Sequence, residues 1–73
     1  MSPFVTSNPA VMHGAPCFAG TRVAVRTLFD HLEAGYTIPE FLGEFPTVRA
    51  EQVRGLLAFL RDEVERAATP TIV

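Results

Sequence analysis

The sequence predicts a mainly α fold, namely a three-helix bundle of the helix-turn-helix kind that follows a short N-terminal arm of β-strands. Apolar residues recur at helical spacing in three segments after residue 24, and glycine and proline separate these segments. The residues before them form short extended runs instead. We therefore expect one domain, with an arm over residues 1–24, a bundle over residues 25–68 and a tail over residues 69–73.

The arm is expected to contain two short strands. The first is predicted around residues 4–6 and is followed by a Ser-Asn-Pro turn, after which an extended run resumes at residues 11–12. Gly14 permits a bend, and a second extended piece over residues 16–19 ends at Gly20. Because two strands alone do not form a stable sheet, we expect this arm to seek a partner strand, which favours a homodimer.

The first helix is predicted to start at Val25. Its apolar side chains fall at i, i+3, i+4 and i+7 and are Val25, Leu28, Phe29 and Leu32. Gly35 is the natural stop for this helix.

The second helix carries a clear start signal. Thr37 is an N-cap residue, Glu40 holds the reciprocal position of a capping box, and Pro39 lies in the first turn. The helix is expected to be short because Pro46 ends it. Its apolar face consists of Ile38, Phe41, Leu42 and Phe45.

The third helix is predicted to be the longest, over residues 50–67. On its solvent side, i,i+4 pairs of Arg61 with Glu65 and of Asp62 with Arg66 should support the helix. Pro70 cannot continue it. One core-facing stripe contains Val53, Leu56, Leu57, Leu60, Val64 and Ala67. A short second helix joined tightly to a long third one matches a helix-turn-helix.

Composition limits the class of protein. The chain has 73 residues and is 48% hydrophobic, which for so small a core suggests that apolar surface meets another chain. Cys17 is the only cysteine, so no intrachain disulfide forms and a reducing cytoplasm is expected. No signal peptide and no apolar run of about 20 residues is recognised, so we expect no membrane association.

The charge is slightly acidic, with a net charge of −2. This argues against strong non-specific binding to nucleic acid. All six basic residues are arginine, whose planar fork suits specific contacts to phosphate, carboxylate or guanine. The absence of lysine is equally consistent with genome base composition alone.

Several ordered motifs resemble one protein family. They lie in "GAPCFAGTRVAVRTLFDHLEAGYTIPEFLGEFPTVRAEQVRGLLAFL", residues 14–60, which resembles the domain of unknown function 433 family. The matching motifs are Gly14-Ala15-Pro16, Gly20-Thr21-Arg22, Ala34-Gly35-Tyr36, Pro39-Glu40, Phe45-Pro46 and the Leu-rich run from Val53 to Leu60.

The resemblance implies a homeodomain-like three-helix fold in small bacterial proteins. Many such proteins are regarded as antitoxins that pair with a neighbouring PIN-like toxin of presumed ribonuclease type. It also implies binding to the promoter, alone or together with the toxin. No cofactor is implied.

Two features depart from the family pattern. Arg49 stands where Ser or Thr usually caps the last helix, and arginine has no side-chain acceptor for the free amides there. Either Thr47 or water substitutes, or Arg49 is placed to reach a phosphate. The tail after Ala67 is short, which leaves little chain to wrap a toxin.

Candidate DNA contacts lie at the start of the third helix and before the first one. In a helix-turn-helix, the early turns of the third helix enter the major groove, where glutamine pairs with adenine and arginine with guanine or phosphate. The alternative is a solvated face, with Glu51 paired to Arg54 and the Arg22 stem packed over the core. The candidate DNA-binding residues are Arg22, Arg26, Arg49, Gln52 and Arg54.

Candidate partner contacts lie farther along the third helix and in the arm. A glycine inside a helix costs about 1 kcal/mol relative to alanine, so Gly55, with Ala58, is expected to leave a groove for another backbone. The acidic residues beyond it would repel phosphate and suit a basic partner. The candidate partner-binding residues are Phe4, Val5, Gly55, Ala58, Asp62 and Glu65.

Catalysis is not expected. His13 and Cys17 lie four apart without further ligands, and no third group orients them as a nucleophile pair. We therefore expect no metal site and no enzyme. The sequence leaves two functions open, an antitoxin-like regulator that binds toxin and DNA, and a protein-interaction module that never touches DNA.

Overall fold

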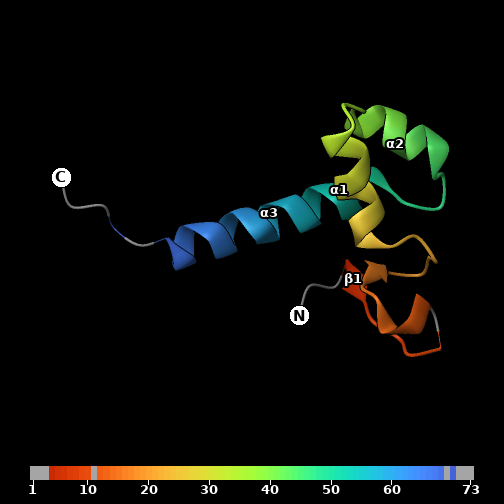
Figure 1. Cartoon of the computed structure of the whole chain (residues 1–73), viewed down its shortest axis with the longest axis horizontal. Helices are drawn as coiled ribbons and strands as arrows, with labels where there is room; N and C mark the ends of the chain where they lie inside the picture. Colours follow the sequence, from red (N-terminus) through yellow and green to blue (C-terminus); the bar gives the residue numbers. More distant parts are fainter. Residues whose placement is uncertain (1–3, 11, 69, 71–73) are drawn as a thin grey trace.

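Three helices and a small hairpin make up the chain in the computed structural model, which describes residues 4–10, 12–68 and 70 (Figure 1). The elements are β1 (Val5–Thr6), the 3-10 turn η1 (Met12–Gly14), β2 (Cys17–Phe18), α1 (Val25–Glu33), α2 (Ile38–Glu44) and α3 (Ala50–Ala67). This confirms the mainly α fold class with short N-terminal strands. Most of the tail predicted over residues 69–73 lies outside the described residues.

The arm folds on both sides of β2. On one side β1 pairs with it in antiparallel register, Val5 opposite Phe18. On the other side the Phe18 amide donates to the Val23 carbonyl at 3.0 Å, and Cys17 forms a bridge with Ala24. The segment that leads into α1 thus pairs with the side of β2 that β1 leaves free.

The predicted extended run at residues 11–12 was wrong in the part that the structure describes. Val11 lies outside the described residues, and Met12 opens η1 instead. His13 and Gly14 both have a positive φ, 55° and 84°, which folds the chain tightly back toward β2. The Ser7 hydroxyl donates to the Gly14 carbonyl across this loop.

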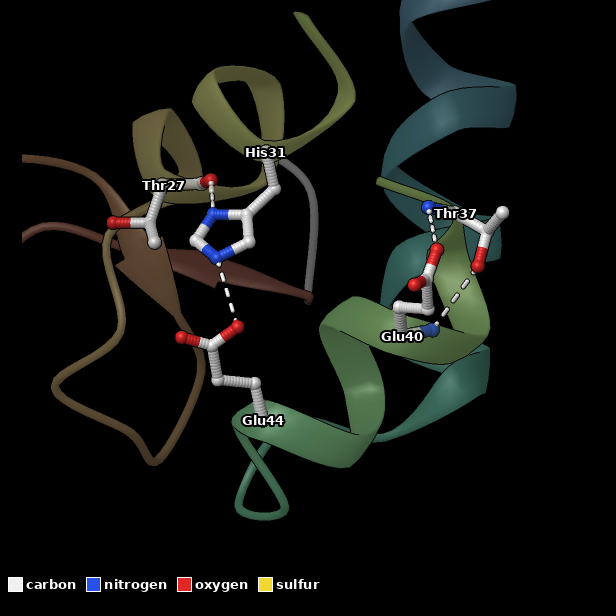
Figure 2. A network of polar contacts seen from close by, with 5 residues as sticks. All are labelled: Thr27, His31, Thr37, Glu40 and Glu44. Carbon is white, nitrogen blue, oxygen red and sulfur yellow. Dashed lines mark hydrogen bonds and ion pairs between the residues drawn. The ribbon is translucent and has the colours of Figure 1, made fainter. Parts of the chain in front are cut away.

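The start of α2 follows from local sequence, as predicted (Figure 2). The Glu40 amide donates to the Thr37 hydroxyl at 3.2 Å, and the Thr37 amide donates to the Glu40 carboxylate at 2.8 Å. The Thr37 amide, and to a lesser extent the Thr37 hydroxyl, stabilise the charged Glu40 carboxylate and lower the pKa of Glu40 below its ordinary value. Gly35, with φ 93°, follows the C-cap residue of α1 and ends that helix, as predicted.

The core brings the hairpin and the three helices together. Its buried side chains come from β2, from each helix and from the segment before α3, and they are Phe18, Leu28, Phe41, Val48, Val53 and Leu56. The Phe18 and Phe41 rings lie 6.1 Å apart, which joins the arm to α2. The first half of α3 lies against this core, whereas its second half extends away from the other elements (Figure 1).

Candidate interaction surfaces along α3

Gln52 is buried, with 3% of its surface exposed, and both ends of its side-chain amide are hydrogen-bonded. Its Oε1 accepts from the Arg49 amide at 2.9 Å, and its Nε2 donates to the Ala19 carbonyl at 2.9 Å. The prediction that Gln52 reads a base is therefore corrected. The side chain links α3 to the arm, and rotating it toward DNA would leave the part-buried Ala19 carbonyl without its donor.

The same glutamine takes part in the start of α3, which has no capping hydroxyl. Arg49 has the extended backbone of an N-cap residue, with φ −98° and ψ 150°, but its side chain has no acceptor. Gln52 provides the return half of a capping box by accepting the Arg49 amide. That bond satisfies the Arg49 amide, whereas the free amides of the first turn of α3 receive no side-chain acceptor from Arg49.

The four candidate arginines of the DNA surface are all exposed. Arg49 pairs with Glu51, Nε to Oε1, at 3.3 Å, so the alternative pairing of Glu51 with Arg54 is not formed. Within the described part of the chain, Arg22, Arg26 and Arg54 form no salt bridge. Three exposed guanidinium groups thus have no anionic partner among the described residues.

Arg22 lies close to the segment that leads into α3. It lines an open hollow of about 550 Å³ together with Thr6 and Thr47. Thr21 shapes the loop, because its hydroxyl donates to the Phe18 carbonyl at 2.9 Å and accepts the Val23 amide at 3.0 Å. Arg26 borders a different hollow, with Pro16 and Asp30. Arg22, but not Arg26, therefore shares a hollow with the segment that precedes α3.

Gly55 is explained by a contact inside the chain. A Cβ atom placed on it would lie 2.2 Å from the Phe4 ring, so the ring occupies the space that a side chain would need. The predicted partner groove is therefore corrected, since its Gly55 end is filled by the arm. Val5 also packs against the core, and Ala58 is half-buried.

The end of α3 exposes apolar side chains. Phe59 is 42% exposed and Val64 is 67% exposed, although the sequence placed Val64 in a core-facing stripe. Sequence reasoning did not single out Phe59. The difference in helix length could have indicated this exposure. A bundle with a seven-residue α2 cannot cover an eighteen-residue α3 along its whole length.

Charged side chains surround these apolar ones. The predicted pair of Arg61 with Glu65 is present, Nε to Oε1, at 3.7 Å. The predicted pair of Asp62 with Arg66 is not, because Arg66 pairs with Glu63 and Asp62 pairs with Arg61 at 3.1 Å. Both arginines near this end are thus already engaged within their own helix.

His31 joins α1 to α2 and was not singled out from the sequence (Figure 2). Its Nδ1 lies 2.8 Å from the Thr27 carbonyl oxygen, and its Nε2 lies 3.1 Å from Glu44 Oε2. The rings of Tyr36, Phe41 and Phe45 lie within 5.6 Å of the imidazole, centroid to centroid. We interpret this as a structural contact, since the Thr27 carbonyl, the Glu44 carboxylate and three aromatic rings hold the imidazole in place.

Groups that could hold a metal are not assembled. Among the described residues, no three His, Cys, Asp or Glu side chains come together for an ion. Cys17 is buried in β2, where its thiol donates to the Ala15 carbonyl at 3.4 Å. None of the described helices is long and apolar enough to cross a membrane.

Comparison with known proteins identifies the family. The model of the family described as "Protein of unknown function (DUF433)" matches residues 5–60. The chain belongs to the DUF433 family. The match begins at β1 and ends at Leu60, so it includes the arm, α1, α2 and the core-facing half of α3.

One curated protein is similar to part of the chain. The chain is 36% identical over 50 residues to "Uncharacterized protein y4eO" of Sinorhizobium fredii (strain NBRC 101917 / NGR234). The aligned part covers 68% of this DUF433 chain but only 23% of the relative, so the chain spans about a quarter of that protein's length. No solved structure matches.

Proposed function

We propose that this DUF433 protein is an antitoxin-like regulator. It binds and neutralises a cognate PIN-like ribonuclease toxin in the cytoplasm and contributes DNA binding for autorepression, in the manner that the motif resemblance implies. It acts by binding and not by catalysis. Autorepression on a palindromic operator would involve a homodimer.

The observation that carries this proposal is the different chemistry at the two ends of α3. Arg49 and Arg54 are exposed near its start, and Arg22 lines a hollow with Thr47 of the segment before it. Carboxylates and apolar side chains are exposed near its end. An eighteen-residue helix is about 27 Å long, so DNA and a protein partner would be bound at separate places.

The DNA half of the proposal depends on a few specific contacts. Arg22, Arg49 and Arg54 suit phosphate or guanine, and the free amides at the start of α3 suit a phosphate. With a net charge of −2, the chain gains little from general attraction to the duplex. We therefore expect the toxin complex to bind the promoter more tightly than the chain alone.

Two assays test the proposal. A gel-shift titration uses the DNA upstream of the gene, with and without the product of the neighbouring reading frame, and an RNA-cleavage assay of that product measures neutralisation. We expect the chain to suppress cleavage and the mixture to shift the DNA. Arg54→Ala should weaken the shift and leave neutralisation intact.

A protein-interaction module without DNA binding is the second candidate. The net negative charge and the cluster of Asp62, Glu63 and Glu65 on α3 favour it. It predicts a complex with the neighbouring product and no shift under any condition. Failure of the chain to bind the neighbouring product and to shift DNA would contradict both functions.

A further inference from the structure

We propose that His31 forms a proton-dependent link between α1 and α2, which holds the end of α2 while the imidazole carries two protons and releases it when one is lost. The link consists of His31 on α1, Glu44 at the end of α2 and the Thr27 carbonyl (Figure 2). The inference goes beyond the proposed function and does not depend on it, because neither DNA nor a partner protein takes part in the link.

Both ring nitrogens of His31 lie next to oxygen atoms that can only accept a hydrogen bond. Nδ1 lies 2.8 Å from the Thr27 carbonyl oxygen, and Nε2 lies 3.1 Å from Glu44 Oε2. A neutral imidazole has one N–H and satisfies one of these contacts, whereas the imidazolium satisfies both. The Glu44 side chain is 55% exposed, and a carboxyl group so open to water is charged near neutral pH. The geometry therefore corresponds to a positively charged His31 that faces a negatively charged Glu44.

Other surroundings of the imidazole favour the same charged form. His31 lies in the last turn of α1, where the helix dipole stabilises a cation. The ring centroids of Tyr36, Phe41 and Phe45 lie 5.2, 5.6 and 5.3 Å from that of the imidazole, within the ~6 Å at which an aromatic ring attracts a positive charge. The His31 side chain is only 18% exposed, so salt screens these interactions less than it would on the open surface.

Within the described part of the chain, Glu44 is the charged group that contacts the imidazole. Asp30 and Glu33 lie beside His31 in the sequence of α1, but both are exposed, and neither forms a salt bridge with it among the described residues. The connection to α2 contributes Tyr36, whose phenol is uncharged in the range where an imidazole titrates. The effect of pH on this contact is therefore determined by the charge of His31.

Loss of one proton breaks the link at Nε2. The Thr27 carbonyl retains the proton on Nδ1, so the lone pair of Nε2 then faces the Glu44 carboxylate. Two acceptors 3.1 Å apart repel each other, and the exposed Glu44 side chain rotates into solvent. An imidazole titrates between about pH 5 and pH 8, so the link is present at the acidic end of this range and is lost as the pH rises through it. Because Glu44 is the last residue of α2, the proton decides whether the end of α2 is held against α1.

The first measurement is the melting temperature of the wild type and of Glu44→Gln at about pH 5.5 and about pH 8.5. Glutamine keeps the size of the side chain and removes its charge. We expect the melting temperature of the wild type, relative to the variant, to fall by about 2–4 °C between the acidic and the alkaline sample, as for one partly exposed ion pair in a domain of this size. A difference that stays constant, or that increases at the alkaline pH, would overturn the inference.

Two control variants show whether His31 is the responsible group. In a His31→Gln background, Glu44→Gln should change the melting temperature by the same amount at both pH values, because the titrating partner is gone. His13→Asn removes the other histidine and should behave like the wild type, since asparagine tolerates the positive φ of 55° at this position. A pH dependence that persists in the His31→Gln background, or that disappears in His13→Asn, would assign it to another group and overturn the inference.

A second measurement locates the protons in the unaltered chain. Proton–nitrogen NMR correlations of the imidazole ring distinguish a nitrogen that carries a proton from one that does not. We expect His31 to carry protons on both nitrogens at about pH 5.5 and on Nδ1 alone at about pH 8.5. A neutral His31 with its proton on Nε2 would preserve the hydrogen bond to Glu44 and overturn the inference. A ring that keeps both protons at the alkaline pH would overturn it as well.

Discussion

Val53 and Val64 belong to the same apolar stripe of α3, but they lie in different surroundings. Val53 is fully buried, whereas Val64 is 67% exposed. The first half of the helix packs on Phe18, Leu28 and Phe41, and the second half of α3 extends away from the other elements (Figure 1). Amphipathic periodicity therefore identifies the face of a helix that is suited to burial, and the neighbouring elements decide how far along the helix burial continues.

The largest predicted effect compares Leu56→Ala with Val64→Ala. Leu56 is 5% exposed, so its truncation should lower the free energy of unfolding by about 2–5 kcal/mol. That is a large part of the roughly 4–11 kcal/mol expected for a chain of this size. Val64→Ala should change it by less than about 0.5 kcal/mol. Urea unfolding followed by circular dichroism measures both, and equal losses would show that the end of α3 is covered in solution.

The next effect concerns the attachment of α3 to the arm. Gln52→Ala removes the hydrogen bonds to Ala19 and Arg49, and we expect a loss of about 1–3 kcal/mol in unfolding free energy. Arg54→Ala, two positions away and exposed, should leave stability nearly unchanged. If Gln52→Ala instead preserved stability and abolished a DNA shift, the base-reading role would be restored.

At the N-cap of α3, a substitution is expected to raise the free energy of unfolding instead of lowering it. Arg49→Ser supplies the missing side-chain acceptor and should stabilise the fold by about 1 kcal/mol, since the exposed pair with Glu51 that is lost is worth little. Thr37→Ala removes the acceptor that α2 already has and should cost about 1 kcal/mol. Differential scanning calorimetry of the two variants checks both signs. A destabilised Arg49→Ser would mean that the arginine contributes more than its geometry indicates.

Phe4 and Gly55 are expected to be coupled. Glycine to alanine in a helix gains about 1 kcal/mol, but the Phe4 ring lies 2.2 Å from the new Cβ and must move. Gly55→Ala should therefore stabilise the Phe4→Ala variant by about 1 kcal/mol and the wild type by clearly less. A double-mutant cycle on unfolding free energies measures the difference. Equal gains in both backgrounds would contradict the contact.

The smallest effect concerns how the capping box at the start of α2 changes the stability of the fold with pH. Because hydrogen bonds from Thr37 lower the folded-state pKa of Glu40, its contribution to stability is present above the unfolded value of about 4.5 and is lost as the pH falls through the lowered value. Glu40→Gln should keep a capping box and remove this part of the acid dependence. Melting temperatures between pH 6 and pH 2.5 provide the test, and an unchanged profile would argue against the assignment.

Local signals in the sequence were sufficient for much of the fold. The bounds of α3, the capping box of Thr37 and Glu40, and the stop at Gly35 were predicted and are present. Each depends on residues within one or two turns of one another. Arg49 and Arg54 were also predicted correctly to be exposed at the start of α3, because arginine rarely lies in a core.

The candidate site was predicted less well where a distant residue decides the outcome. Nothing near Gln52 in the sequence indicates that its side-chain amide donates to the Ala19 carbonyl. Nothing near Gly55 indicates that the Phe4 ring packs against it. The ion pairs near the end of α3 also differ, because Arg66 selects Glu63 over Asp62 and several pairings of similar energy are available on an exposed helix.

By itself, the sequence determined which segments are helical, where they begin and end, and which face of each is apolar. Backbone hydrogen bonds, caps and side-chain periodicity act over a few residues, so they can be recognised in one stretch of chain. Only the tertiary structure decided that Gln52 is a buried link, that Gly55 receives Phe4, and that Val64 is exposed. Those outcomes depend on which distant atoms share a volume, and close packing decides them when the whole chain is folded.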